Sequence, residues 1–241
     1  MIVIDHPPAF PEAVASVRIS RRQLLAGFGL GSALAATGCA SPSLKLLGGP
    51  FRGKGGHPGG YSLSPEQIEA IPYASLGVRI GDSAPVIMIL ASINGRRLHW
   101  ASADRVVLVT EAGRLVKTIG MPRDLVETRW TGADALLPAL RREVGADEVR
   151  IGRIVDLRPQ DDFGVPVESR CEWRGETRLK LLGSERPAIL VTERIRVRKW
   201  RWKTENRYWF DPATGQMLKS RQQYCPDVAP VTLEALKPAD E

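Results

Sequence analysis

Cys39 is the residue of this chain whose surroundings most directly indicate a chemical reaction. Residues 36–39 read ATGC, so three small side chains lead directly into a thiol. Such a run is typical of a lipobox, in which the thiol receives a diacylglyceryl group and the cysteine becomes the mature N-terminus. The apolar stretch before it, residues 24–37, is shorter than the roughly 20 residues that a membrane-spanning helix needs. The pattern predicts a signal peptide over residues 1–38 with lipidation at Cys39, the alternative being an ordinary cleavable signal with an incidental cysteine.

Two arginines, Arg21 and Arg22, stand directly before the apolar stretch. Residues 20–25, SRRQLL, are similar to the twin-arginine export motif, with Leu24 in place of the common Phe. The arginine pair is therefore the expected export signal, although such pairs also occur in signals of the general secretory route. Ala40 follows the cysteine where an Asp would indicate retention in the inner membrane. We expect a lipid-anchored protein on the periplasmic face of the outer membrane.

Two further cysteines, Cys171 and Cys225, remain after lipidation. An even pair in an oxidising compartment indicates one disulfide. We expect the two residues to approach closely enough to form a bridge, with two buried free thiols as the alternative.

Residues that would support catalysis or metal binding are few. The mature chain holds two histidines, His57 and His99, and has neither the Cys/His spacing of a zinc site nor a G-x-S-x-G nucleophile motif. A glycosidase needs only two carboxylates across a sugar site. Four carboxylates near expected turns could supply them, although such positions are more often turn chemistry: Asp104, Glu111, Asp161 and Asp162. We therefore expect no metal, no cofactor and no enzymatic activity.

Residues 194–210, RIRVRKWRWKTENRYWF, combine cations with aromatic side chains. Apolar residues fall on odd positions up to Val197 and on even positions from Trp200 onward, which predicts one long strand with a β-bulge near Lys199. Its outer face would be basic and could contact an acidic polysaccharide or an acidic partner. The residues expected to do so are Arg196, Arg198, Arg201, Lys203, Trp200 and Trp202. The alternative is a solvated strand whose cations deter edge pairing.

The chain carries a formal net charge of +7. Outside the cytoplasm, the anions available to it are acidic glycans, lipid head groups and acidic protein faces. Nucleic acid is therefore not an expected partner.

The rest of the sequence must position these residues, and its patterns are mostly those of β-strands. Residues 84–92 and 106–110 are apolar runs, and residues 165–178 alternate between apolar or small odd positions and mostly charged even positions. Asn94-Gly95 and Ala112-Gly113 are typical hairpin turns. Short helices are expected over residues 64–67, 122–126 and 133–143.

The sequence shows no repeat and no alternation of strands with helices, so the sheet should be largely antiparallel. The predicted fold is mainly β, with antiparallel twisted sheets that form a sandwich or an incomplete barrel and a few short helices. Residues 39–62, rich in Gly, Pro, Ser and Lys, are expected to be a lipid-anchored flexible tether. Residues 63–241 are expected to form a single β-rich domain.

Three blocks of the sequence follow the order of a known family. They are residues 72–83 (PYASLGVRIGDS), 98–129 (LHWASADRVVLVTEAGRLVKTIGMPRDLVETR) and 207–223 (RYWFDPATGQMLKSRQQ). Together with a final LEALKP, they resemble the YjbF/GfcB family of exopolysaccharide and group 4 capsule lipoproteins. The twin-arginine-like signal, and Ala36 where a lipobox usually has Leu, depart from the family pattern and concern the export route only.

The resemblance implies a β-rich outer-membrane lipoprotein, encoded beside other polysaccharide-export genes, that serves assembly or secretion of a surface polysaccharide. The expected function is therefore that of a non-enzymatic accessory factor. Its expected partners are the membrane through Cys39, other envelope proteins of polysaccharide export and an acidic polysaccharide. The family carries no established catalytic residues to transfer. A lipid or lipoprotein carrier with a curved β-sheet, or a polysaccharide-modifying glycosidase, is the alternative.

Overall fold

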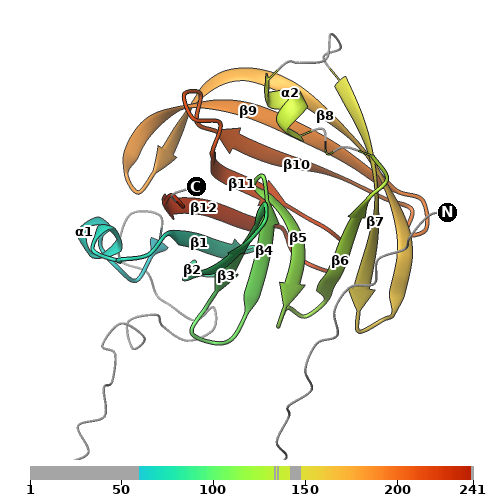
Figure 1. Ribbon diagram of the computed structural model, residues 1–241, viewed down its shortest axis with the longest axis horizontal. Helices are drawn as coiled ribbons and strands as arrows, with labels where there is room; N and C mark the ends of the chain where they lie inside the picture. Colours follow the sequence, from blue (N-terminus) through green and yellow to red (C-terminus); the bar gives the residue numbers. More distant parts are fainter. Residues whose placement is uncertain (1–59, 133, 135, 142–147, 240–241) are drawn as a thin grey trace, which may run out of the picture. The chain divides into compact units, whose positions relative to one another are not determined.

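The computed structural model describes residues 60–132, 134, 136–141 and 148–239, which form one curled β-sheet with two short helices (Figure 1). The helices are α1 (Pro65–Glu69) and α2 (Leu136–Arg141). The strands are β1 (Ser75–Ile80), β2 (Val86–Asn94), β3 (Arg97–Ala101), β4 (Val107–Glu111), β5 (Arg114–Ile119), β6 (Asp124–Trp130), β7 (Glu148–Arg158), β8 (Asp162–Leu181), β9 (Ser184–Val197), β10 (Trp202–Phe210), β11 (Met217–Gln222) and β12 (Val231–Lys237). No helix in these described residues is long and apolar enough to cross a membrane.

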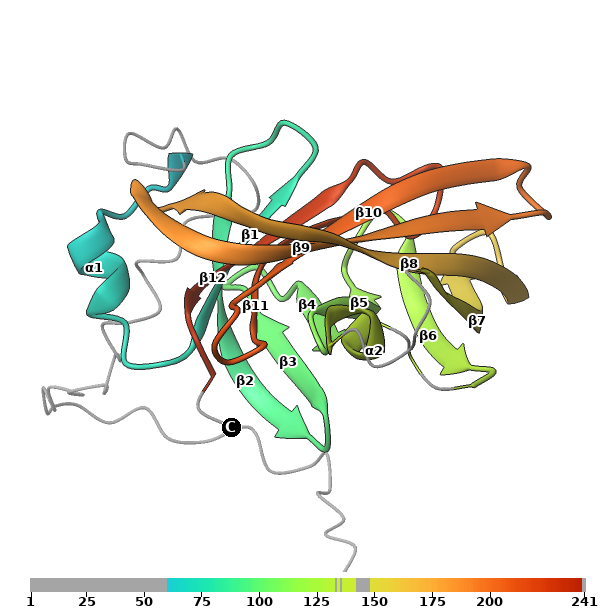
Figure 2. The same ribbon diagram turned by 90° about the horizontal axis from the view of Figure 1, so that it is seen from above.

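Each strand is antiparallel to its neighbours, in the order β5-β4-β3-β2-β1-β12-β11-β10-β9-β8-β7-β6. Apart from the β1–β12 pair, hydrogen-bonded neighbours are consecutive along the chain, so the sheet is an up-and-down meander joined by its first and last strands. β5 and β6 remain as edges but contact each other, because the sheet curls until its edges meet (Figures 1 and 2). The nearly closed barrel confirms the predicted antiparallel, mainly β fold.

The alternation predicted for residues 165–178 is present in β8. Val165, Val167, Ser169 and Cys171 are buried, whereas the residues between them are exposed. The buried side faces the barrel interior, because a period of two places alternate side chains on one face. The largest core cluster there joins apolar side chains from all around the sheet, among them Leu76, Leu108, Leu157, Ile195 and Leu233.

α2 confirms the short helix expected within residues 133–143. Its buried residues are Leu136, Ala139 and Leu140. They form a second core cluster with side chains of three strands: Cys171, Val191, Tyr208 and Phe210. The helix therefore covers part of the barrel interior beside β8, β9 and β10.

Residues 122–126, expected to be helical, instead complete a turn and begin β6 at Asp124. The Asp124 carboxylate accepts hydrogen bonds from the backbone N–H groups of Gly120 (3.1 Å) and Met121 (3.0 Å) and from the Thr118 hydroxyl (2.9 Å). An Asp side chain that satisfies nearby backbone amides favours a turn over a helix. These bonds hold the tight connection between β5 and β6.

The predicted long strand with a β-bulge at Lys199 is also wrong. β9 ends at Val197 and β10 begins at Trp202, and these two residues pair directly across a hairpin. The turn between them is closed by a hydrogen bond from the Arg201 N–H to the Arg198 carbonyl (3.1 Å), with Arg201 at a φ of 48°. The four residues of the turn move the inward-facing positions from odd numbers in β9 to even numbers in β10. A β-bulge would cause the same change, so the sequence pattern is the same for a hairpin and a bulged strand.

Residues 60–71, called the strap below, pack on the outside of the barrel. Tyr61, which falls in the expected tether, is 1% exposed, and its hydroxyl donates to Glu234 of β12 (2.6 Å). α1 begins as predicted at Ser64, whose hydroxyl accepts from the Gln67 N–H while the Gln67 side chain accepts from the Ser64 N–H. The folded part of the chain thus includes residues before the expected boundary at 63.

Gly77 of β1 is the point where the strap approaches the sheet most closely. A Cβ at this position would lie 2.0 Å from the Tyr61 hydroxyl oxygen. We expect Gly77→Ala to push the strap away and lower the free energy of unfolding by about 1–3 kcal/mol, the usual range for overpacking. Urea denaturation measures the change. Gly132→Ala is the matched control, because a Cβ there meets nothing within 4 Å, and equal stability of both variants would contradict this packing.

Candidate functional site

Glu193 of β9 is a fully buried carboxylate in the barrel interior. One of its oxygens accepts a hydrogen bond from Arg153 of β7 (2.6 Å). The other accepts from Arg114 of β5 (2.5 Å) and from two residues of β10, Tyr208 (2.9 Å) and Asn206 (3.3 Å). A buried charge is tolerated when it is paired and hydrogen-bonded in this way. The carboxylate is saturated by donors from three strands.

Arg114 extends this network towards α2. Its guanidinium forms a two-pronged ion pair with Asp134 (3.1 and 3.4 Å) and lies over the rings of Trp130 and Tyr208, at 5.4 and 5.5 Å from their centroids. Asp134 in turn accepts from the backbone N–H of Leu136, the first residue of α2 (3.1 Å). The same arginine therefore ties the β5 edge both to β9 and to the start of the helix.

Gln222 of β11 satisfies backbone groups at the edge of the sheet. Its side-chain amide donates to the Gly113 carbonyl (2.8 Å), and its side-chain oxygen accepts from the N–H of Leu115 in β5 (2.9 Å). The second amide hydrogen goes to the Ser220 hydroxyl (2.8 Å). A side chain from across the barrel thus replaces a neighbouring strand at this part of the edge, where unpaired groups would otherwise invite association.

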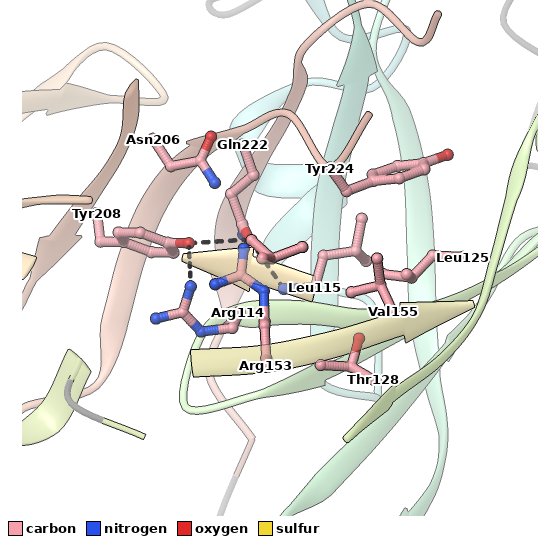
Figure 3. Close-up of a pocket in the computed structure, with 11 residues that line it drawn as sticks. Arg114, Leu115, Leu125, Thr128, Arg153, Val155, Asn206, Tyr208, Gln222 and Tyr224 are labelled. Carbon is pink, nitrogen blue, oxygen red and sulfur yellow. Dashed lines mark hydrogen bonds between the residues drawn. The ribbon is translucent and has the colours of Figure 1, made fainter. Parts of the chain in front are cut away.

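Arg114, Arg153, Tyr208 and Gln222 converge on a small cavity between the strands (Figure 3). Its volume of about 10 Å³ is close to the minimum that holds one water molecule. A cavity of this size has no room for an acyl chain or a sugar ring. The polar interior is therefore filled by the protein's own side chains.

Burial alone would raise the pKa of Glu193, but the charges of Arg114 and Arg153 outweigh burial and hold the pKa well below its ordinary value. Glu193 is therefore ionised at neutral pH. A general acid needs a proton to donate, and a nucleophile needs a free lone pair and an open path to its substrate. Glu193 has none of these, so the arrangement stabilises the barrel and does not present a catalytic carboxylate.

The predicted basic residues lie on the outside of the barrel. Arg196, Arg201 and Lys203 are exposed and have no bonding partner in the part of the chain that the structure describes. Arg198 differs, because it forms an ion pair with Glu168 of β8 (3.1 Å). Arg221 of β11 is also exposed and, within the described ranges, equally unpaired, and the sequence analysis did not single it out. Within the described ranges, Arg196, Arg201, Lys203 and Arg221 are therefore free cations on the outer face of β9–β11.

The two tryptophans predicted to accompany these cations lie elsewhere. Trp200 and Trp202 are half-buried against the main core cluster, and their rings meet edge to face with centroids 6.3 Å apart. The Trp200 indole donates to Asp162 (3.2 Å), which also pairs with Lys199 (2.5 Å) and Arg123. These rings close the core near the β9–β10 turn and do not line the basic face.

The carboxylates weighed as a glycosidase pair are held by cations or lie in turns. Asp162 has the contacts just described, and Glu111 pairs with Arg96 (3.8 Å) and Arg97 (3.5 Å). Asp104 and Asp161 lie in turns, and His99 lies in β3. No cluster of three or more metal-binding side chains occurs among the described residues. The candidate residues Arg21, Arg22, Cys39 and His57 lie outside the described ranges.

The expected disulfide between Cys171 and Cys225 is not formed, and both residues are buried free thiols. Cys171 packs in the cluster beside α2, whereas Cys225 belongs to the main core cluster. The structure corrects the expectation because two inward-facing cysteines can be buried in one interior without being neighbours.

The sequence analysis missed the Glu193 network, although one signal for it was present. Apolar residues occupy the odd positions up to Val197, opposite the basic outer face, and Glu193 has the same odd phase. A carboxylate on an inward phase implies a buried cationic partner. The identity of that partner, Arg114, could not be inferred because it lies 79 residues earlier in the chain.

Replacing Glu193 should destabilise the protein strongly, because Glu193→Gln leaves two buried guanidinium groups without their shared charge. We expect a loss of about 3–5 kcal/mol in the free energy of unfolding. The low pKa of folded Glu193 also means that its contribution is full above the unfolded pKa of about 4.3 and is lost as the pH falls below it. Urea denaturation at pH 7 and pH 3 should show the difference between wild type and variant shrinking at low pH.

Glu185→Gln is the control, because Glu185 forms only an exposed ion pair with Arg178 (3.4 Å) and should change stability little. A Glu193→Gln variant as stable as this control would contradict the central role of the carboxylate.

The two buried thiols should react slowly in the folded protein. Burial raises the pKa of Cys171 to about 12 and that of Cys225 to about 11, and the thiolate is the form that reacts. Using protein with Cys39→Ala, we expect little alkylation at pH 8 in the native state and alkylation of both thiols in urea without reductant. Mass spectrometry of the alkylated chain measures this. Thiols that can be alkylated in urea only after a reductant is added would show that the disulfide is formed.

Comparisons with known proteins agree on one family. A family model described as group 4 capsule polysaccharide lipoprotein gfcB, YjbF matches residues 57–236. The uncharacterized lipoproteins GfcB and YjbF of Escherichia coli (strain K12) are each 29% identical to this chain, covering 74% and 76% of it and 82% and 84% of their own lengths. The crystal structure of the hypothetical lipoprotein YmcC from Escherichia coli (K12) has a TM-score of 0.66 at 29% identity, covering 74% of this chain and 91% of that one. Family, sequence and fold therefore coincide, and this chain belongs to the YjbF family of group 4 capsule polysaccharide lipoproteins.

Proposed function

We propose that this protein is an outer-membrane lipoprotein that acts as a non-enzymatic accessory factor in the assembly or secretion of an exopolysaccharide or capsule. The family supports the polysaccharide pathway and the lipoprotein character. Cys39 is the proposed site of the diacylglyceryl anchor, and Arg21 and Arg22 are the proposed export signal. The folded domain then acts from the periplasmic face of the membrane.

The observation that carries this proposal is the filled interior of the barrel. The saturated carboxylate of Glu193 and the cavity of about 10 Å³ leave no space for a cargo or a substrate in the part of the interior around Arg114. A protein of this build works through its outer surface, by binding other molecules. An accessory role in an assembly fits that constraint.

The alternatives require features that the described residues do not favour. A carrier needs an apolar cavity long enough for an acyl chain, and the cavity by Arg114 is only water-sized. A glycosidase needs one carboxylic acid and one carboxylate at an open cleft. The candidate carboxylates Glu111 and Asp162 are each held by two cations.

The proposed partners follow from location and charge. Other envelope proteins of polysaccharide export are the proposed protein partners, and the membrane is contacted through the acyl chains on Cys39. The chain's net positive charge, which remains after removal of residues 1–38, favours acidic partners over neutral ones. No cofactor is part of this proposal.

Removing the lipid attachment site should separate the protein from the membrane and stop its contribution to polysaccharide output. We expect Cys39→Ala to move the protein to the soluble fraction or block its processing, because one thiol carries the anchor. Cell fractionation, mass spectrometry of the mature N-terminus and a polysaccharide assay measure these effects. Ser41→Ala is the control and should behave as wild type. An unmodified N-terminus, or full output from soluble Cys39→Ala protein, would refute the anchored accessory role.

A further inference from the structure

We infer that the outer face of β9–β11 is a binding surface for an acidic polysaccharide. This inference rests on the proposed function and adds the ligand class and the residues that bind it. The surface, called the cationic wall below, is defined by its exposed outward-facing cations: Arg194, Arg196, Arg201, Lys203, Arg207 and Arg221.

The register of the sheet places like charges directly opposite each other on this wall. Arg196 of β9 pairs with Lys203 of β10, and Arg207 of β10 pairs with Arg221 of β11. Side chains at such positions have Cβ atoms about 5 Å apart, and like charges there destabilise the sheet. Glu168 of β8 lies opposite Arg196 on its other side, and Glu205 pairs with Arg207, so carboxylates offset part of this repulsion. The repulsion that remains between Arg196 and Lys203 does not help folding, which points to a use outside folding.

Only part of this charge is neutralised by neighbouring carboxylates. Arg194 pairs with Glu172 (3.1 Å) and Arg207 with Glu205 (3.1 Å). The other four cations of the wall have no partner in the part of the chain that the structure describes: Arg196, Arg201, Lys203 and Arg221. The next row of the same face is balanced instead, because Lys219 pairs with Glu234 (2.6 Å). Free positive charge is therefore concentrated on the wall.

Protection of a sheet edge does not account for these cations. Lysine and arginine on an edge strand deter association with another chain. β9, β10 and β11 are each hydrogen-bonded on both sides, and the sheet edges are β5 and β6. The cations thus lie in the middle of the sheet, where edge protection is not needed.

The geometry suits an extended polymer with repeated carboxylates. Neighbouring strands are about 4.8 Å apart, and alternate residues along one strand are roughly 6.6 Å apart. Free cations on three adjacent elements can therefore meet several charges of one chain at once. Each exposed contact is weak, but contacts made by linked groups reinforce one another.

The composition of the wall favours a dissolved polymer over a membrane surface. Binding to a lipid interface combines cations with apolar side chains that insert between head groups. The large exposed hydrophobic residues of the described structure lie outside the wall: Tyr73, Ile93, Ile119 and Phe163. The cationic wall therefore has positive charge but no large exposed apolar side chain that could insert between lipid head groups.

The test compares two full-length variants with equal loss of charge. The wall variant replaces Arg196, Arg201, Lys203 and Arg221 with Gln, and no ion pair found in the structure is broken by it. The control variant replaces four exposed cations outside β9–β11 with Gln: Arg96, Arg105, Arg158 and Lys180. Each mature protein, purified in non-ionic detergent, is titrated with polygalacturonate, neutral dextran and vesicles containing anionic phospholipid.

We expect wild type and control to bind polygalacturonate and the wall variant to bind about tenfold more weakly, equal to about 1.4 kcal/mol. Binding should weaken as salt shortens the screening length from about 10 Å at 0.1 M. Equal binding by the wall and control variants would overturn the inference, as would equal binding of dextran or stronger binding of the vesicles.

A single substitution separates binding from folding. Lys203→Glu places a negative charge opposite Arg196 and should raise the melting temperature while weakening polygalacturonate binding. A raised melting temperature with unchanged binding would also overturn the inference. The proposed accessory role is tested separately. Full polysaccharide output in Cys39→Ala cells would refute it, whatever the result of this titration.

Discussion

The barrel depends on one buried interaction, the ion pairs that Glu193 forms with Arg114 and Arg153. The ladder of backbone hydrogen bonds ends at β5 and β6, so backbone bonding alone leaves the sheet open along that seam. Glu193 reaches from β9 across the interior to β5 on one side of the seam and to β7 on the other, while Gln222 satisfies groups at the β5 edge. Side chains thus supply the closure that a continuous ladder supplies in a complete barrel.

The same interaction limits what the interior around Arg114 can hold. The Glu193 carboxylate is satisfied by Arg114, Arg153 and two residues of β10, so the protein's own donors occupy this part of the interior. Barrels that carry ligands keep their interior free for them. On the outer face of this protein, Arg196, Lys203 and Arg221 form no ion pair within the described part of the chain. The sheet tolerates the repulsion between like charges across its strands there.

Features that depend on local periodicity are predicted correctly from the sequence. Features that depend on contacts between residues far apart in the chain are not. The alternation in β8 and the capping residues at Ser64 are local, and both agree with the structure. The turn at Asp124 was mistaken for a helix because three hydrogen bonds of one side chain decide its shape. Near Lys199, a hairpin and a β-bulge change the inward-facing positions in the same way, so the sequence does not distinguish them. The partners of Glu193 and Cys171 depend on which strands meet across the interior, which the sequence does not show.

Under the lipid anchor proposed at Cys39, the strap has a mechanical consequence, because the protein would then be held by its N-terminal segment. Tension along that segment reaches the sheet at Tyr61, which packs on Gly77 of β1 and bonds to Glu234 of β12, itself held by Lys219 of β11. These three strands occupy the middle of the strand order, as far as the sheet allows from the seam between β5 and β6. A pulling force on this segment would therefore first reach strands that are hydrogen-bonded on both sides and not the seam between β5 and β6.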